Sequence, residues 1–242
     1  MSEAWHEGRV IENRHWSEAL FSLRVEHAPL EFSAGQFVRI ALDVEGERVA
    51  RAFSFVNPPH DPVLEFYGIV VPGGPLSPRL ARLRKGDTLY IARNPAGFLV
   101  LAEVPDAETL WLMATGTGLA PFLSILRTEA PWKRFRNVVV VHAVRFANEL
   151  TYREMIAATP ARYVSFVSRE AAAGSLAGRI PAAIGDGRLE AAAGMRLVPE
   201  TSHVMLCGNP DMLKDVQAAL AARGMKKHRR RAPGHITVES FW

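Results

Sequence analysis

The hydrophobic pattern of this 242-residue chain changes at about residue 105, and this change limits the folds available to it. Before that point, short apolar or alternating segments such as 36–42, 49–56 and 63–71 are typical of β-strands. They are separated by turn residues, as at 57–62 and 72–75, which leave little room for helices. About six strands at this spacing predict a small antiparallel β-barrel.

One helix is expected within this first part, at residues 77–83. Ser77 is expected to be its N-cap, because a serine hydroxyl accepts hydrogen bonds from free N–H groups of the first turn. Pro78 suits the first helical position.

After residue 105 apolar strands alternate with helical stretches, which predicts parallel strands covered by helices on both faces. The expected strands are 109–114, 137–142, 163–167, 203–207 and 235–239, and the expected helices are 119–127, 149–158, 179–184 and 210–222. Asn209 as N-cap, Pro210 next to it and Gly224 beyond the end mark the last helix. We therefore expect two domains: a six-stranded antiparallel barrel at 1–103 and an α/β domain with a five-stranded parallel sheet at 104–242. A ligand is expected at the carboxyl ends of the parallel strands.

Composition excludes several classes of protein. A single cysteine, Cys207, cannot form a disulfide within the chain or supply the thiolates of an iron-sulfur cluster. The spacing of the eight histidines offers no recognisable metal set. No apolar run is long enough to span a membrane, and residues 1–7 lack the layout of a signal peptide, so we expect a cytoplasmic protein without membrane association.

The net charge of +4 is unevenly distributed. Residues 1–103 carry 11 basic and 13 acidic side chains, whereas the remainder carries 18 and 12. The basic excess is concentrated in a run that comprises Lys226, Lys227, Arg229, Arg230 and Arg231. Such a run is usually a solvated loop, but it can also attract acidic proteins, phosphates or nucleic acid.

Residues 114–121, with the sequence ATGTGLAP, lie between an expected strand and an expected helix. Glycines there allow close approach of a ligand to the backbone, and free N–H groups at a helix start favour phosphate. Pro121 replaces the last glycine of the usual dinucleotide fingerprint, so a plain tight turn is the alternative.

The residues that follow the next two strands favour NADP over NAD. Arg145 follows one strand and Arg169 follows the other, with Glu170 after it, and Arg179 lies ten residues further on. Arginine suits a 2′-phosphate, whereas a carboxylate suits the ribose hydroxyls of NAD. A single arginine at the end of a strand more often only faces solvent and binds no ligand.

The first half contains two further segments of interest. Residues 51–54 combine an arginine, an aromatic ring and a hydroxyl on an expected strand. Strand alternation places Arg51, Phe53 and Phe55 on one face, unless a bulge intervenes. Residues 73–77 form a second glycine loop that leads into a helix and suits a phosphate. Read alone, residues 51–54 are more often a half-buried strand.

Five segments, in this order, resemble the ferredoxin-NADP reductase family. They are RAFS at 51–54, GPLS at 74–77, GTGLAP at 116–121, VSRE at 167–170 and CGNP at 207–210. The terminal pair Phe241 and Trp242 resembles the chain end of the bacterial ferredoxin/flavodoxin-NADP reductases. The resemblance covers essentially the whole chain.

The resemblance implies an FAD site in the first domain. The residues implied to bind FAD or lie near the flavin are Arg51, Ala52, Phe53, Ser54, Gly74, Leu76, Ser77, Thr117, Phe241 and Trp242. Ser54 is implied to lie near flavin N5. Phe53 stands where the family usually has tyrosine, so ring stacking is kept but a phenol hydrogen bond is lost.

It likewise implies an NADP site in the second domain. The implied residues are Gly116, Thr117, Gly118, Arg145, Ser168, Arg169, Arg179, Cys207 and Gly208. Cys207 is implied to lie near the nicotinamide and is, with Ser54, the catalytic candidate. It need not act as a nucleophile, because hydride transfer is the chemistry of the cofactors.

The implied function is electron transfer between NADPH and ferredoxin or flavodoxin through FAD, by a monomer. Arg229, Arg230 and Arg231 are expected to steer the acidic carrier toward the flavin. The alternatives are a general flavin or quinone reductase and a module that binds nucleic acid through the basic run. No nucleic-acid motif accompanies that run, so the second alternative is disfavoured.

Overall fold

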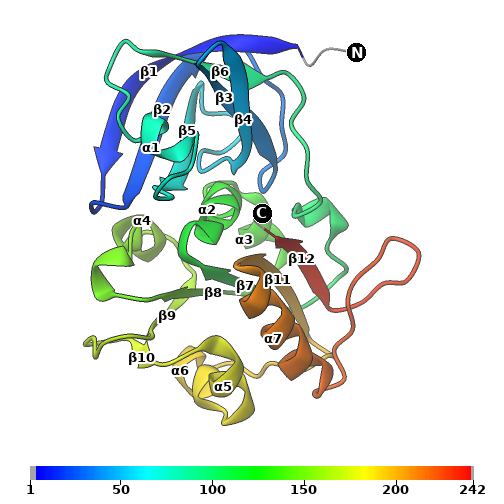
Figure 1. Ribbon diagram of the computed structural model, residues 1–242. Coiled ribbons are helices and arrows are strands. Elements are labelled where there is room, and N and C mark those ends of the chain that lie inside the picture. Colours follow the sequence, from blue (N-terminus) through cyan, green and yellow to red (C-terminus); the bar gives the residue numbers. More distant parts are fainter. Residues whose placement is uncertain (1–3, 241–242) are drawn as a thin grey trace. The chain divides into compact units, whose positions relative to one another are not determined.

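A computed structural model describes residues 4–240, and the chain forms two compact units (Figure 1). The first unit contains the residues up to Val100 together with Ala120–Thr128. The second contains Leu101–Leu119 together with the residues from Glu129 onward. The chain therefore passes from one unit to the other three times. The first unit is called the barrel unit and the second the α/β unit, and Ala120–Thr128 belongs to the barrel unit although the residues on both sides of it belong to the α/β unit.

The first unit is a curled antiparallel sheet of six strands in the order β4-β3-β6-β1-β2-β5. The strands are β1 (Trp5–His15), β2 (Leu20–His27), β3 (Phe37–Val44), β4 (Glu47–Ser54), β5 (Val63–Ile69) and β6 (Thr88–Ala92). Its interior is filled by apolar side chains from all of these strands, among them Phe21, Ile40 and Phe66, none of which is exposed. The predicted six-stranded barrel is confirmed.

The barrel closes where the chain changes partner after β4. Ser54 is paired with Phe37 of β3, but the next residue, Phe55, forms an antiparallel bridge to Phe66 of β5. Ser54, Phe55 and Val56 are consequently all buried, so the expected alternation of faces ends at Ser54. The Phe55 ring stacks on Phe32 with their centroids 3.9 Å apart.

The short helix α1 (Ser77–Leu80) begins at the expected residue but is capped differently. Leu76 is the N-cap, and the Ser77 hydroxyl accepts a hydrogen bond from the Val71 N–H at 2.9 Å instead of capping the helix. The helix ends three residues early because the Asn13 side-chain amide donates to the carbonyls of Leu80, Ala81 and Leu83.

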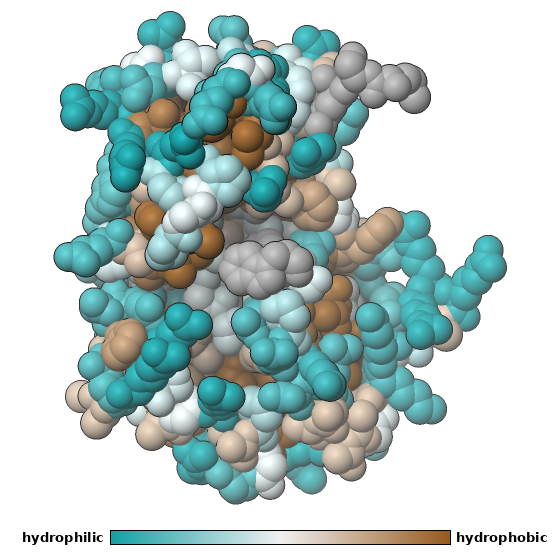
Figure 2. Space-filling model, viewed as in Figure 1, coloured by the Kyte–Doolittle hydropathy of each residue, from teal (hydrophilic) through white to brown (hydrophobic). Residues whose placement is uncertain are grey.

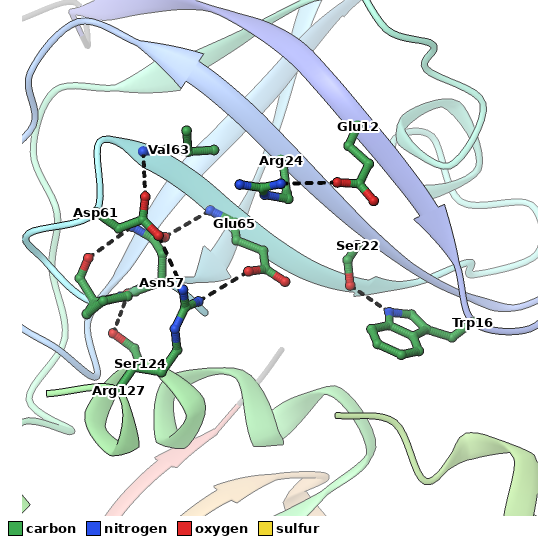
Figure 3. A network of polar contacts seen from close by, with 11 residues as sticks. Glu12, Trp16, Ser22, Arg24, Asn57, Asp61, Val63, Glu65, Ser124 and Arg127 are labelled. Carbon is green, nitrogen blue, oxygen red and sulfur yellow. Dashed lines mark hydrogen bonds and ion pairs between the residues drawn. The ribbon is translucent and has the colours of Figure 1, made fainter. Parts of the chain in front are cut away.

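Helix α2 (Ala120–Leu126) and the residue after it are tied to the barrel by a polar network (Figure 3). The Ser124 hydroxyl donates to the Asn57 carbonyl at 2.7 Å, and the Asn57 side chain accepts from the Glu65 N–H at 2.9 Å. Arg127 forms ion pairs with Asp61 at 3.2 Å and with Glu65 at 3.3 Å. These contacts explain why this segment belongs to the first unit.

The second unit is built on a parallel sheet of six strands in the order β10-β9-β8-β7-β11-β12. Its strands are β7 (Thr109–Thr115), β8 (Asn137–Val144), β9 (Arg162–Val167), β10 (Leu176–Ala177), β11 (Ser202–Gly208) and β12 (Ile236–Ser240). Its helices and 3₁₀ turns are η1 (Leu101–Glu103), η2 (Gly116–Leu119), α3 (Ala130–Arg134), η3 (Ala147–Glu149), α4 (Arg153–Ala157), α5 (Ile180–Gly185), α6 (Arg188–Ala193) and α7 (Pro210–Ala221). The predicted parallel α/β architecture is confirmed with one strand more than expected, because β10 is too short to give a pattern in the sequence.

The apolar core of this unit lies between the sheet and the helices α5, α6 and α7. Trp111, Val139 and Leu206 of the sheet, all with no exposed surface, face this core together with Val216 of α7. Figure 1 shows α7 lying over β11 and β12, which it contacts. The helix expected at 179–184 corresponds to α5, which begins and ends one residue later, whereas the sequence pattern does not predict α3 and α6.

The expected signals of α7 are present. The Asn209 side chain accepts hydrogen bonds from the N–H groups of Asp211 and Met212, and Gly224 adopts a positive φ of 81° beyond the end. Among the helices of residues 4–240, none is both long enough and apolar enough to cross a membrane.

Candidate functional site

In the barrel unit, the hydroxyl of Ser54 is buried without a hydrogen-bond partner among residues 4–240. Ser54 is 2% exposed, at the end of β4 where the chain leaves β3. A buried hydroxyl that lacks a partner costs free energy, so such an atom is expected at a place where a ligand supplies one. This observation fits a cofactor at Ser54.

Phe53 precedes Ser54 and lies half-buried against β5. Its ring meets Phe66 edge-on, and a Cβ added at Gly68 would lie 3.1 Å from the Phe53 ring and 2.7 Å from the Phe21 ring. Glycine at position 68 therefore leaves room for the Phe53 ring. The position of Phe53 suits contact with a flat ligand on the same strand as Ser54.

Arg51 and Ala52 lie on the exposed part of β4, before Phe53. The Arg51 guanidinium donates to the carbonyl of Ala50 at 2.7 Å. Further N–H groups of a guanidinium remain for a phosphate, since Arg carries five donors.

The loop before α1 is a tight turn. The Gly74 N–H donates to the Val71 carbonyl at 2.9 Å, with Pro72 and Gly73 between them, and Gly73 has a φ of 71°. This is the layout of a type II turn, in which the third residue requires a positive φ. Leu76 is buried, and the Ser77 hydroxyl is used by Val71 but keeps its own proton to donate.

In the second unit, the glycine turn η2 lies against the end of β11. A Cβ added at Gly118 would lie 2.6 Å from the Cys207 carbonyl oxygen, and one added at Gly208 would lie 2.2 Å from the Thr115 hydroxyl. The Thr115 hydroxyl accepts from the Asn209 N–H at 3.0 Å. These glycines therefore let the loops after β7 and β11 meet directly, while Gly116 and Thr117 remain partly exposed.

Cys207 is fully buried in β11, between Ala114 of β7 and Glu239 of β12. Burial raises the pKa of the Cys207 thiol well above its usual range, and the Glu239 carboxylate raises it further. Cys207 is therefore a neutral thiol, in agreement with a residue that positions and does not attack. Glu239 is a neighbour that sequence reasoning missed.

Arg145, Arg169 and Arg179 each follow one of three neighbouring strands at its carboxyl end. Arg145 follows β8 and Arg169 follows β9, and the Arg169 N–H donates to the Arg145 carbonyl at 2.9 Å. Arg179 follows β10, which pairs with the end of β9. The missed strand is thus the element that brings Arg179 to the same edge of the sheet as the other two.

Other polar groups near these arginines serve the backbone. Glu149 accepts from the N–H groups of Arg145 and Phe146, and Glu170 accepts from the Ala147 N–H at 2.5 Å. The hydroxyl of the exposed Ser168 donates to the Val144 carbonyl at 3.1 Å. Glu170 is thus held through one of its oxygens by a backbone N–H of the loop after β8.

The basic run forms an ordered hairpin. Arg229 and Ala232 exchange backbone hydrogen bonds, with Arg230 and Arg231 at the corner. The Arg230 guanidinium forms hydrogen bonds to both carboxylate oxygens of Glu103 at 2.9 and 3.0 Å. These hydrogen bonds hold the pKa of Glu103 below its usual range. In Figure 2 the side on which Figure 1 draws this loop is covered by hydrophilic side chains.

Two predicted residues, Phe241 and Trp242, lie outside the described residues. Sequence reasoning found no metal set among the histidines. It did not single out His142, which is fully buried and contacts the Gly116 carbonyl in the glycine turn. Its place beside a valine run in β8 was the only signal.

Comparison with known proteins identifies both units. The family model of the oxidoreductase FAD-binding domain matches residues 9–99, and that of the oxidoreductase NAD-binding domain matches residues 112–218. A flavodoxin/ferredoxin-NADP reductase of Shigella flexneri is 52% identical over 98% of this chain and 99% of its own. A ferredoxin-NADP reductase of Pseudomonas aeruginosa is 35% identical over 96% of this chain and 95% of its own.

Among solved structures, a ferredoxin NADP+ reductase from Neisseria gonorrhoeae with bound FAD and NADP superposes with a TM-score of 0.96. It is 32% identical, and the match covers 100% of both chains. Sequence identity over whole chains and agreement of the fold lead to one conclusion: this chain belongs to the flavodoxin/ferredoxin-NADP reductase family.

Proposed function

We propose that this protein transfers electrons between NADPH and a flavodoxin or ferredoxin through bound FAD. The observation that carries the proposal is the presence of two separate nucleotide-site candidates, one in each unit. One is centred on the buried, unpartnered hydroxyl of Ser54, and the other on the three arginines that follow β8, β9 and β10. FAD, when bound, accepts a hydride and releases its electrons one at a time, which a nicotinamide does not do.

In the FAD-binding domain, which we propose to comprise residues 1–103, the FAD would be held by β4 and the loop before α1. Arg51 would bind the pyrophosphate together with the N–H groups of Leu76 and Ser77 in the loop after Gly74, and Ala52 would give room beside it. Phe53 would pack on the cofactor, and the Ser54 hydroxyl would donate to the flavin near N5. Phe241 and Trp242 are proposed to cover the flavin.

In the NADP-binding domain, which we propose to comprise residues 104–242, NADP would lie along the carboxyl ends of the strands. The turn Gly116–Gly118 would bind the pyrophosphate and border the nicotinamide, and Thr117 would contact both cofactors. The 2′-phosphate would be bound by Arg145, Arg169 and Arg179, with Ser168 beside them. Cys207 and Gly208 would lie next to the nicotinamide.

The carrier is proposed to dock on the basic hairpin. Because Arg230 forms an ion pair with Glu103, we propose that it holds the hairpin in place. The exposed Arg229 and Arg231 would then attract the carrier. A hydrogen-bonded hairpin holds its charges in a fixed pattern, which favours steering of an acidic protein. We propose a cytoplasmic monomer.

The first experiment is the visible spectrum of the purified protein. Flavin bands that bleach with NADPH at concentrations where NADH has little effect are the expected result. A colourless protein that takes up no added FAD would contradict the proposal.

The second experiment separates the carrier from small acceptors. We expect the double substitution Arg229→Gln and Arg231→Gln to slow reduction of flavodoxin about tenfold at low salt, and to leave reduction of a small uncharged acceptor dye unchanged. Arg9→Gln together with Arg82→Gln, an equal loss of charge in the barrel unit, is the matched control. Equal slowing of both acceptors would count against docking at the hairpin.

A further inference from the structure

His142 is a buried imidazole that the proposed reaction does not use. It lies in β8 directly after the run Val138–Val141, with no exposed surface. A polar ring in such a place is stable only when its nitrogens have partners. Both partners are present, and one belongs to the glycine turn.

The partners define which nitrogen carries the proton. Nε2 lies 3.2 Å from the Gly116 carbonyl oxygen, and Nδ1 lies 3.5 Å from the Tyr163 hydroxyl in a long hydrogen bond. A carbonyl oxygen only accepts, so Nε2 carries the hydrogen and donates. Nδ1 is then the acceptor, and the Tyr163 hydroxyl donates to it.

This arrangement does not change near neutral pH. Burial lowers the pKa of His142 to about 4, and burial raises the pKa of Tyr163 to about 12. Both groups are therefore neutral at pH 7, and the hydrogen bond to Gly116 is made by an uncharged imidazole. The pair is a fixed support for the turn.

The hydrogen bond acts on a particular peptide plane. The Gly116 carbonyl and the Thr117 N–H lie on opposite edges of one planar trans peptide and point in opposite directions. Gly116 has a φ of 51° and begins the 3₁₀ turn η2, and no atom of the described residues lies within 4 Å of the position of a Cβ there. When His142 binds the carbonyl, the Thr117 N–H is turned away from the imidazole.

We propose that His142 is a positioning residue for nucleotide binding, which orients the Thr117 N–H toward the dinucleotide phosphate by binding the Gly116 carbonyl. The inference rests on the proposed function, since it concerns the same NADP site. Tyr163 supports it by keeping the hydrogen of the imidazole on Nε2.

The test compares His142→Leu, which removes the donor, with His142→Gln, whose amide N–H can take the place of Nε2–H. We expect His142→Leu to weaken binding of NADP+ to the oxidised holoenzyme about tenfold, equivalent to about 1.4 kcal/mol, as measured by titration of the flavin spectrum. His142→Gln should restore most of the affinity. His203→Leu, which removes another buried histidine of the same sheet, is the matched control and should leave the affinity unchanged.

A second ligand separates positioning from general damage. Adenosine 2′-monophosphate, measured by competition against NADP+, carries the phosphate proposed for the arginines but lacks the pyrophosphate. Its affinity should therefore be the same in the wild-type and His142→Leu proteins.

Equal weakening of both ligands, or no weakening of NADP+, would overturn the inference. If His142→Leu does not fold, Tyr163→Phe provides the test, with an expected two- to threefold weakening of NADP+ alone and with unchanged affinity as the result against it. A wild-type protein that binds FAD but not NADP+ would instead contradict the proposed function.

Discussion

The Ser124 hydroxyl donates a hydrogen bond to the backbone carbonyl of Asn57 at 2.7 Å, although 67 positions separate the two residues. Both are fully buried, and Asn57 in turn accepts from the Glu65 N–H through its side chain. The bond joins α2 to the loop between β4 and β5 (Figure 3). It is one reason why residues 120–128 belong to the barrel unit.

Ser124→Ala should therefore destabilise the barrel unit by about 1–2 kcal/mol, because the buried Asn57 carbonyl loses its donor. Urea denaturation measures this as a lower midpoint. Thr128→Val is the matched control, since the Thr128 hydroxyl bonds only to the Ile125 carbonyl of the same segment. A midpoint for Ser124→Ala equal to that of the wild type would show that the bond contributes nothing.

Ser54→Ala tests the opposite case. Because the Ser54 hydroxyl has no partner in the part of the chain that the structure describes, its removal should leave the stability of the FAD-free protein unchanged or slightly higher. Reduction of the bound flavin by NADPH, followed by stopped-flow absorbance, should slow at least tenfold. If the FAD-free variant is destabilised by more than about 1 kcal/mol, the hydroxyl has a structural partner after all.

Gly118→Ala should destabilise the α/β unit by about 1–3 kcal/mol, because the new methyl group would lie 2.6 Å from the backbone carbonyl of Cys207. It should also weaken binding of NADP+, since the turn must move. Gly185→Ala is the control: a Cβ there has nothing within 4 Å, and stability should stay equal or rise by up to about 1 kcal/mol. Thermal denaturation of both variants measures the effect. Similar midpoints for the two variants would show that position 118 does not lie as close to the Cys207 carbonyl as described.

Two buried histidines predict a loss of stability in acid. Burial lowers the pKa of His142 to about 4 and that of His203 to about 3, so both bind protons more weakly when folded than when unfolded. The stability that the protein gains from keeping these histidines neutral is fully present above pH 6.5, the pKa of an unfolded histidine. It is lost as the pH falls toward the lowered pKa values of the folded state.

Between pH 7 and pH 5 the loss should be about 2 kcal/mol for each histidine, measured by urea denaturation. In His203→Leu, the slope of the free energy of unfolding against pH should fall by an amount that corresponds to nearly one bound proton. The variant also loses the hydrogen bond between His203 and Thr237. A variant with the pH dependence of the wild type would rule out His203 as a source.

The three arginines predict the preference for NADPH. Arg169→Ala should raise the KM for NADPH about ten- to a hundredfold, because a charge-assisted hydrogen bond contributes about 1.5–3 kcal/mol, and should leave the KM for NADH unchanged. Arg162→Ala, at the opposite end of the same strand β9, should change neither. Steady-state kinetics with both nucleotides measure this, and an equal rise for NADH would place Arg169 away from the 2′-phosphate.

Much of this protein follows from local sequence patterns. The change of period near residue 105 predicts a barrel followed by an α/β part, and Asn209, Pro210 and Gly224 define the ends of α7, because these features depend on residues close together in the chain. Arg145 and Arg169 could be found in the same way, since each directly follows a strong strand pattern.

Other features depend on contacts between distant residues. A two-residue strand such as β10 exists only because β9 is beside it, and it is this strand that brings Arg179 to the edge where Arg145 and Arg169 lie. The Ser77 hydroxyl binds Val71 instead of capping α1, and α2 belongs to the barrel because Ser124 meets Asn57. His142 acquires a role only when β7 and β8 lie in register and place its ring beneath Gly116. Local propensity carries no information about such partners, so the tertiary structure alone decided them.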